Sequence, residues 1–126
     1  MKSQNPVAWF EIPVANIERA QKFYEDVFQI TMTAMDLGGP KMAWFPNNGP
    51  DTYGATGGLM QYDSYVPSHE GTLIYLSCQD LKDELRRVEA AGGKVLQEKT
   101  QISPEHGFMG LMEDTEGNRV ALHSSH

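Results

Sequence analysis

Apolar and polar positions follow the same order in two segments of the chain. In "WFEIPVANIERAQKFY" and in "LIYLSCQDLKDELRRV", strict alternation gives way to helical spacing after a capping Asn or Asp. The alternating apolar residues correspond at a spacing of 64 positions: Phe10, Ile12 and Val14 in the first segment, and Ile74, Leu76 and Cys78 in the second. The capping residues Asn16 and Asp80 stand 64 positions apart as well. Because twice this spacing spans nearly all of the 126 residues, we expect two copies of one structural unit.

Each copy is predicted to fold as a strand, a helix and three further strands. Asn16 and Asp80 are suitable N-caps, because their side chains accept hydrogen bonds from unpaired amides of the first helical turn. Helical spacing gives each helix one apolar face: Ile17, Ala20, Phe23, Tyr24, Val27 and Phe28 on the first, and Leu81, Leu85 and Val88 on the second. Gly92 and Gly93 are expected to end the second helix. The later strands are predicted at about 31–37, 41–46 and 55–62, and at about 94–100, 107–113 and 118–124.

The predicted fold class is α+β, with two tandem β-α-β-β-β modules whose mixed sheets curl around a central cleft. Residues 1–126 form a single domain with module 1 at about 5–62, a polar linker at about 63–71 and module 2 at about 72–124. Neither module can cover both faces of its own sheet. The modules therefore pack together within the chain or are exchanged between two chains, and the length of the linker permits both arrangements.

Strand residues that point away from the helices are predicted to line the cleft. Because side chains alternate along a strand, Trp9 and Glu11 face the cleft when Phe10 and Ile12 face the helix. The same alternation selects Gly58 and Met60 in module 1, and Leu73, Tyr75, Ser77, Ala121 and His123 in module 2. Tyr62 and Met112 are further candidates for the lining. One of Trp44 and Phe45 is expected to face the core, so core filling is the default interpretation of that pair. The loops at 47–54 and 101–107 are the best candidates for mobile lids.

Glu11 is a carboxylate within an apolar run, and it is predicted to face a cavity. An ionised carboxylate removed from water costs several kcal/mol unless it is paired. In a structural hypothesis, Glu11 bonds a backbone amide, a Tyr hydroxyl or His123 and fixes the register of the modules. In a functional hypothesis, Glu11 is a general acid or base with His123 as its partner. Both hypotheses predict that Glu11 and His123 lie close together.

The charge and cysteine content exclude several classes of function. A formal net charge of −7 with ten Lys and Arg argues against nucleic acid or an anionic membrane as a partner. No stretch approaches the roughly 20 apolar residues of a spanning helix, and the N-terminus lacks the pattern of a signal peptide. The single cysteine, Cys78, excludes an internal disulfide, fits a reducing cytoplasm and is interpreted as a packed thiol. We therefore expect a cytoplasmic protein.

The repeated unit, the segment "VANIERAQKFYEDVF" and the closing "EDTEGNRVALHS" resemble the vicinal oxygen chelate superfamily, which includes glyoxalases, bleomycin resistance proteins and ring-cleaving dioxygenases. The resemblance covers essentially the whole chain and is greatest to small glyoxalase-like proteins of unassigned activity. It implies a small-molecule ligand or substrate and a homodimer. It does not by itself imply an activity, because one fold supports many reactions.

The resemblance also implies where a metal would bind. The metal enzymes of the superfamily take ligands from the first, fourth, fifth and eighth strands, and the matching positions here are Trp9, Gly58 or Met60, Leu73, and Ala121. None of these side chains donates a lone pair from oxygen or nitrogen, whereas a catalytic site needs about three protein ligands. We therefore predict no metal and no other cofactor. If these ligand positions are displaced by two residues, they fall on Glu11, Tyr75 and His123, with Tyr62 as a fourth group. A divalent-metal site at the displaced positions therefore stays an alternative.

Two classes of function remain open at this point, and the sequence does not decide whether the protein is an enzyme. The first is metal-independent binding of a small, partly apolar molecule in a cleft lined by Trp9, Met60, Tyr62, Leu73, Tyr75 and Met112. The second is a lyase or isomerase that acts next to a carbonyl, with Glu11 and His123 as acid and base. A metal-dependent glyoxalase or dioxygenase with a displaced site is a further alternative.

Overall fold

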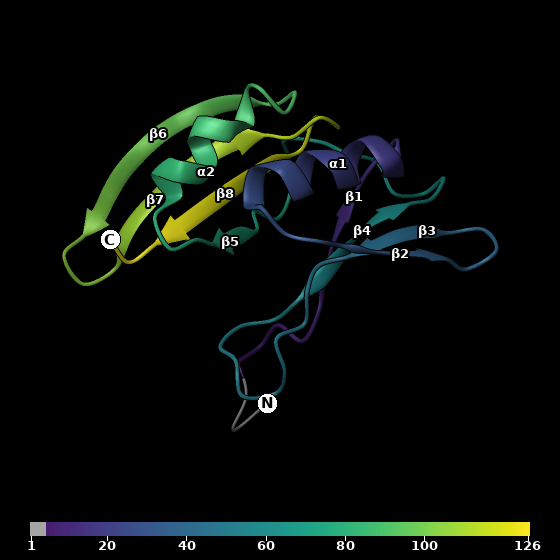
Figure 1. Ribbon diagram of the computed structural model, residues 1–126, viewed down its shortest axis with the longest axis horizontal. Helices are drawn as coiled ribbons and strands as arrows, with labels where there is room; N and C mark the ends of the chain where they lie inside the picture. Colours follow the sequence, from purple (N-terminus) through teal and green to yellow (C-terminus); the bar gives the residue numbers. More distant parts are fainter. Residues whose placement is uncertain (1–4) are drawn as a thin grey trace.

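A computed structural model describes residues 5–126 and contains two modules, each with four strands and one helix (Figure 1). The first module consists of β1 (Phe10–Pro13), α1 (Ile17–Phe28), β2 (Thr33–Asp36), β3 (Lys41–Trp44) and β4 (Gly57–Gln61). The second consists of β5 (Tyr75–Ser77), α2 (Leu81–Val88), β6 (Lys94–Ser103), β7 (Gly107–Glu113) and β8 (Arg119–Ser124). The strand orders are β1-β4-β3-β2 and β5-β8-β7-β6, with β1 parallel to β4 and β5 parallel to β8. The predicted α+β fold of two tandem β-α-β-β-β modules is confirmed.

Both predicted helix caps are present. The side chain of Asn16 accepts a hydrogen bond from the Arg19 amide at 3.1 Å, and that of Asp80 accepts one from the Lys82 amide at 3.1 Å. The second helix ends at Val88, before the predicted Gly stop, and Gly92 then adopts a left-handed φ of 106° in the turn that leads into β6. No helix in the described range 5–126 has the length and apolar character needed to cross a membrane.

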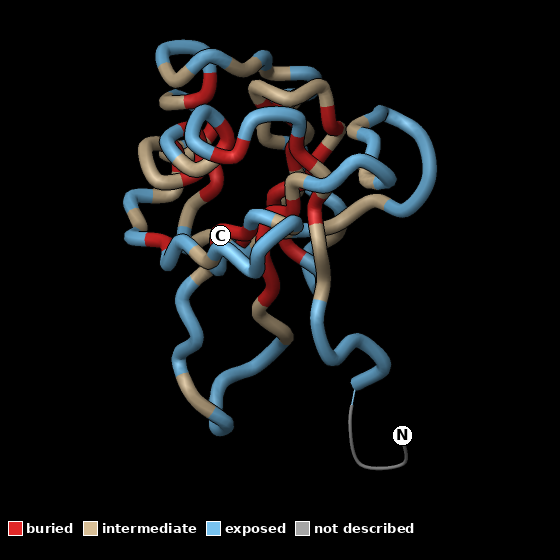
Figure 2. The backbone as a smooth tube through the Cα atoms, turned by 90° about the vertical axis from the view of Figure 1, so that its right-hand side faces the viewer, coloured by how far each residue is buried: buried red, intermediate tan, exposed pale blue. Residues whose placement is uncertain are grey.

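The two helices pack against each other and share one core with the inner faces of both sheets. Figure 2 shows the buried residues gathered in the interior, whereas the loops are exposed. The Arg87 Nε of α2 donates to the Val27 carbonyl of α1 at 2.8 Å, which ties the helices together. On the first sheet, Ile12 of β1 and Leu59 of β4 are buried against the helices, as the alternation predicted. The outer faces of both sheets therefore point away from the common core.

Two predictions about module 2 are wrong. Met112 does not line a cleft: it is fully buried in the core, because its register opposite Val120 places it on the inner face of the sheet. The predicted loop at 101–107 is mostly strand, since β6 continues to Ser103 and β7 begins at Gly107. Only residues 104–106 form the turn, which is too short for a mobile lid.

The turn between β7 and β8 joins the modules. The Asp114 carboxylate is buried and accepts hydrogen bonds from the Tyr24 hydroxyl at 2.7 Å and from the Asn118 amide at 2.9 Å. Burial, followed by the charge and hydrogen bond of Asp114, raises the pKa of Tyr24 well above its ordinary value, so the phenol remains a donor. Asn118 Nδ2 donates to the Pro13 carbonyl at the end of β1, at 2.7 Å. This turn of module 2 thus holds β1 and α1 of module 1.

Glu116 of the same turn binds the start of α1. Its buried carboxylate accepts from the amides of Ala15 and Asn16 at 3.0 and 2.9 Å and from Arg19 Nε at 2.8 Å. Burial acts to raise the pKa of the Glu116 carboxyl, but the hydrogen bonds from Arg19, Thr115 and the two amides hold it below its ordinary value. The carboxylate is therefore kept ionised where the N-terminus of a helix favours negative charge.

Candidate functional site

The outer face of the first sheet carries the predicted carboxylate. In the register of the sheet, Glu11 lies opposite Gly58, and Gly58 lies opposite Trp44. A Cβ atom on Gly58 would come within 3.0 Å of Trp44 Cδ1, so the indole leans over this glycine on the outer face. The predicted placement of Glu11 and Gly58 on the face away from the helices follows from this register.

Glu11 is held by two neutral donors. Trp9 Nε1 donates to Oε2 at 3.2 Å, and the Tyr65 hydroxyl donates to Oε1 at 3.0 Å. The hydrogen bond to Glu11 and then its charge raise the pKa of Tyr65 above its ordinary value, so the phenol stays protonated. Of the partners considered for Glu11, the Tyr hydroxyl is confirmed. That hydroxyl comes from the predicted linker, where no pattern in the sequence indicated it.

Two indole rings form the apolar part of this face. The rings of Trp9 and Trp44 meet edge to face with centroids 5.7 Å apart, and the residues are 41% and 36% exposed. Trp44 Nε1 also donates to the Met42 sulfur at 3.4 Å, and Met42 lies opposite Met60 in the sheet. The prediction that one of Trp44 and Phe45 faces the core is confirmed, because Phe45 packs against the core while Trp44 is on the outer face. Indole rings offer a large apolar area to a bound group, and flexible thioethers adapt to its shape.

The remaining predicted residues are spread over the second sheet and the end of β4. His123 lies opposite Ser77 on β5, and its Nε2 donates to the His106 carbonyl at 2.7 Å. Tyr75 lies opposite Ala121 and is about half exposed. Tyr62 follows β4 and is also about half exposed. Glu11 and His123 thus belong to different sheets, and no hydrogen bond joins them within the described part of the chain.

The residues at these positions do not fit a divalent metal. Among residues 5–126, no group of three or more His, Cys, Asp and Glu side chains is placed to hold an ion. Of the displaced set, Glu11 is engaged by Trp9 and Tyr65, and His123 uses Nε2 as a donor, which removes that nitrogen as a ligand. The donor set here therefore lacks the three converging ligands that a catalytic zinc or similar ion requires.

Two cavities lie along the junction of the modules. The smaller, of about 450 Å³, is lined by Trp9 and Glu11 together with linker residues such as Val66. The larger, of about 940 Å³, is lined by Leu73 and Tyr75 among others. The predicted binding residues Trp9, Leu73 and Tyr75 are thus divided between two cavities, because β1 and β5 are edge strands of separate sheets, whereas Met60, Tyr62 and Met112 line neither cavity.

Comparisons with known proteins agree with this architecture. The family model described as the Glyoxalase/Bleomycin resistance protein/Dioxygenase superfamily matches residues 6–122. A glyoxylase-like domain-containing protein of Didymella fabae is 30% identical over 121 residues, which are 92% of this chain and 91% of that protein.

Solved structures share the fold at low sequence identity. A glyoxalase/bleomycin resistance protein from Albidiferax ferrireducens T118 is 16% identical with a TM-score of 0.69, and the match covers 94% of this chain and 98% of that one. Glyoxalase I from Zea mays is 18% identical with a TM-score of 0.69, and the match covers 95% of this chain but 46% of the maize chain. Such identities establish the fold and no activity. From the family model and the Didymella relative, the chain belongs to the Glyoxalase/Bleomycin resistance protein/Dioxygenase superfamily.

Proposed function

We propose that the protein binds a small, partly aromatic molecule at the outer face of the first sheet, without a divalent metal. The observation that carries this proposal is the exposed Trp9–Trp44 pair beside the Glu11 carboxylate. An apolar surface with a few fixed polar groups is the usual composition of a small-molecule site.

Each part of this surface supplies a different interaction. The two indoles offer apolar area with few rotatable bonds, which lowers the entropic cost of ordering them around a ligand. The Glu11 carboxylate is oriented by Trp9 and Tyr65, and it retains lone pairs for a hydroxyl or N–H of the ligand. Met42 and Met60, which pair in adjacent strands on the same face, are buried and support this surface from within.

Catalysis by Glu11 and His123 has less support than binding. An acid–base pair must reach the same substrate within about one hydrogen bond or one bridging water. Here Glu11 is bonded to Trp9 and Tyr65, while His123 is bonded to the His106 carbonyl on the other sheet. No hydrogen bond or ion pair in the described structure joins the two side chains, so binding is the function that the geometry supports best.

A second copy of the chain is the proposed cover for the outer faces. Trp9, Trp44 and Tyr75 are large side chains that a single chain leaves exposed on these faces. A sheet gains stability when its second face is also covered, so we propose a homodimer in which the outer faces of two copies enclose the cleft.

Sedimentation velocity of the full chain should show a dimer. Tyr75→Asp should shift it toward monomer, whereas Tyr53→Asp, on an exposed loop, should not; a monomer at all concentrations would contradict the proposal.

Ligand binding can be followed by tryptophan fluorescence. A thermal-shift screen of small aromatics and 2-oxo acids selects a ligand, which is then titrated into the wild-type chain. We expect Trp9→Ala to weaken binding about tenfold or more, since the loss of a stacked indole costs on the order of 1–2 kcal/mol. Tyr53→Ala, a change to an exposed aromatic residue away from this face, is the matched control. Equal affinity of Trp9→Ala and wild type, or no ligand in the screen, would count against the proposed site.

A further inference from the structure

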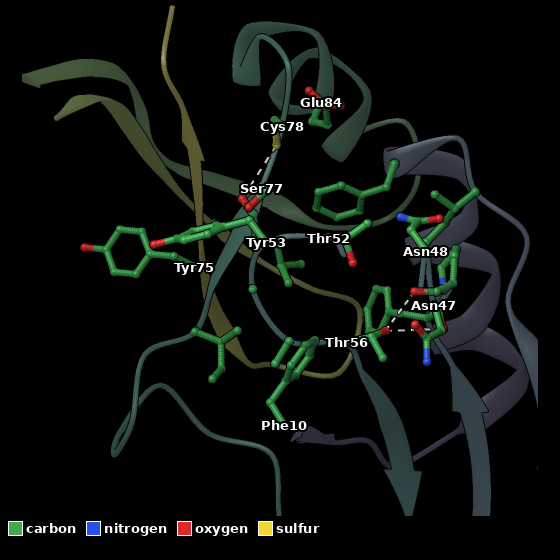
Figure 3. A pocket seen from close by; sticks show the side chains of 18 of the residues that line it. Phe10, Asn47, Asn48, Thr52, Tyr53, Thr56, Tyr75, Ser77, Cys78 and Glu84 are labelled. Carbon is green, nitrogen blue, oxygen red and sulfur yellow. Dashed lines mark hydrogen bonds between the residues drawn. The ribbon is translucent and has the colours of Figure 1, made fainter. Parts of the chain in front are cut away.

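The larger cavity adjoins the smaller one at Phe10 and Ile74 but has its own polar group. It lies between the loop at 45–56, β5 and the first turn of α2, and its volume is about 940 Å³. Figure 3 shows Glu84 and Cys78 at one end of this cavity and Phe10 at the other. Trp9 and Glu11 are not among its lining residues. The cavity is therefore a second place where a small molecule can bind.

The Glu84 carboxylate at one end lacks a strong hydrogen-bond donor among the described residues. Its side chain is 15% exposed, and Oε1 is buried without a partner among the described residues. The Arg87 guanidinium is the nearest cation, but its Nη2 lies 3.7 Å from Oε2, beyond an ordinary hydrogen bond. Arg87 Nε is used by the Val27 carbonyl at 2.8 Å, which holds the guanidinium toward α1. A nearly buried carboxylate in this situation gains free energy when a donor arrives.

Cys78 beside Glu84 does not satisfy this need. Burial first, and then the negative charge of Glu84 and a hydrogen bond to its carboxylate, raise the pKa of the thiol to about 12. The thiol therefore stays protonated at neutral pH, but S–H is a weak donor, and its contact with the Leu76 carbonyl is 3.8 Å long. The charge of Glu84 is thus only partly compensated by its protein neighbours.

The rest of the cavity combines aromatic walls with further negative charge. Phe10 and Phe45 line it with ring centroids 5.6 Å apart, and Phe28 lies on the same lining. Asp80 and Asp83 also line it; Asp80 pairs with Lys99 and Lys82, and Asp83 pairs with Arg86. A bound molecule would therefore meet aromatic rings at one end and the Glu84 carboxylate, with its unpartnered Oε1, at the other.

From these observations we propose that the cavity is a binding site for an organic amine, in which an ammonium group donates to Glu84 and an aromatic or aliphatic body packs against the apolar lining between Glu84 and Phe10. A protonated amine supplies the strong donor that Glu84 Oε1 lacks, and it adds positive charge to that of Arg87, whose Nη2 lies 3.7 Å from Oε2. A neutral alcohol of the same size supplies only a donor, and a carboxylic acid is repelled. The site is independent of the proposed function at the Trp9 surface.

Benzylamine and benzyl alcohol are the probes that test this site. In calorimetric titrations of the full chain at low ionic strength, benzylamine should bind about tenfold or more tightly than benzyl alcohol. Glu84→Gln keeps the shape of the side chain and removes its charge, so it should lower the affinity for benzylamine to that for benzyl alcohol. Glu89→Gln, an exposed change of the same charge on the next turn of the chain, should leave benzylamine binding unaltered.

Amide chemical shifts of the wild-type chain provide a measurement that does not depend on any variant. Benzylamine should shift the amides of residues 47–56 and 77–84, and it should do so equally in Trp9→Ala, which separates this site from the Trp9 surface. The proposal is overturned if benzylamine fails to bind at 10 mM, on the order of the weakest affinities for so small a ligand. It is also overturned if the alcohol binds as well as the amine, if Glu84→Gln binds as wild type does, or if the shifts lie elsewhere.

Discussion

Replacing Asp114 with alanine is expected to lower the free energy of unfolding by about 3–5 kcal/mol, a large part of the stability of a domain of this size. Asp114 is 2% exposed and accepts hydrogen bonds from the Tyr24 hydroxyl, the Asn118 side chain and two backbone amides. Its loss leaves the buried Tyr24 hydroxyl without an acceptor and frees the turn that holds Pro13. The two modules should then separate more easily. Urea unfolding followed by circular dichroism measures the change.

The control for Asp114 is an acidic residue without such contacts. Asp51 is exposed in the loop between β3 and β4, and Asp51→Ala should change the free energy of unfolding by less than about 0.5 kcal/mol. Tyr24→Phe should cost less than Asp114→Ala, because it removes one donor and leaves the other partners of the carboxylate in place. If Asp114→Ala unfolded at the same urea concentration as wild type, the turn would not be the contact that holds the modules together.

Gly57→Ala is expected to destabilise the protein by about 2–3 kcal/mol and to weaken ligand binding at the Trp9 surface as well. A Cβ atom on Gly57 would lie 2.2 Å from the Phe10 carbonyl oxygen and 2.6 Å from Phe10 Cδ2. Relief requires β1 to move away from β4, since the first of these contacts is with backbone. Because Glu11 follows Phe10 on β1, that movement also displaces the carboxylate of the proposed site.

Unfolding and ligand titration of the same variant measure both effects of Gly57→Ala. Gly39→Ala is the matched control, because a Cβ there meets only Tyr62 Cε1 at an ordinary 3.4 Å. It should retain wild-type stability to within about 1 kcal/mol and full ligand affinity. A Gly57→Ala protein with the stability of wild type would show that β1 and β4 can separate at no cost, contrary to the packing described above.

Much of the fold could be predicted because each module repeats simple local patterns. The alternation at Phe10 and Ile12 identified the inner face of β1, and Asn16 and Asp80 identified the starts of both helices. The same alternation failed for Met112, because "FMGLME" has apolar side chains at both parities and only pairing with β8 decides which face is buried. The sequence left open which of Trp44 and Phe45 faces the core for a similar reason, since the two residues are adjacent and both are large and apolar.

The contacts of the site were harder to predict than its position. Glu11 was located from the sequence, but its partner Tyr65 lies 54 residues away in a polar linker with no periodic pattern. The segment "DTEGN" was predicted only as a turn, and its contacts with Tyr24, Arg19 and Pro13 depend on how the modules pack. The missing donor at Glu84 depends on the positions of Arg87 and Cys78, which no local pattern fixes. Such contacts follow from tertiary packing, which local propensity does not encode.

The central claim is that ligand binding at the Trp9 surface needs no divalent ion. The most direct test is a titration of the aromatic ligand into protein treated with EDTA, and into the same protein with one equivalent of Zn²⁺ or Mn²⁺ added. Since no described group of side chains is placed to coordinate an ion, the affinity should be the same in both samples to within about twofold. A ligand that binds only in the presence of the ion, with one ion retained per chain and lost in Glu11→Gln, would contradict the account.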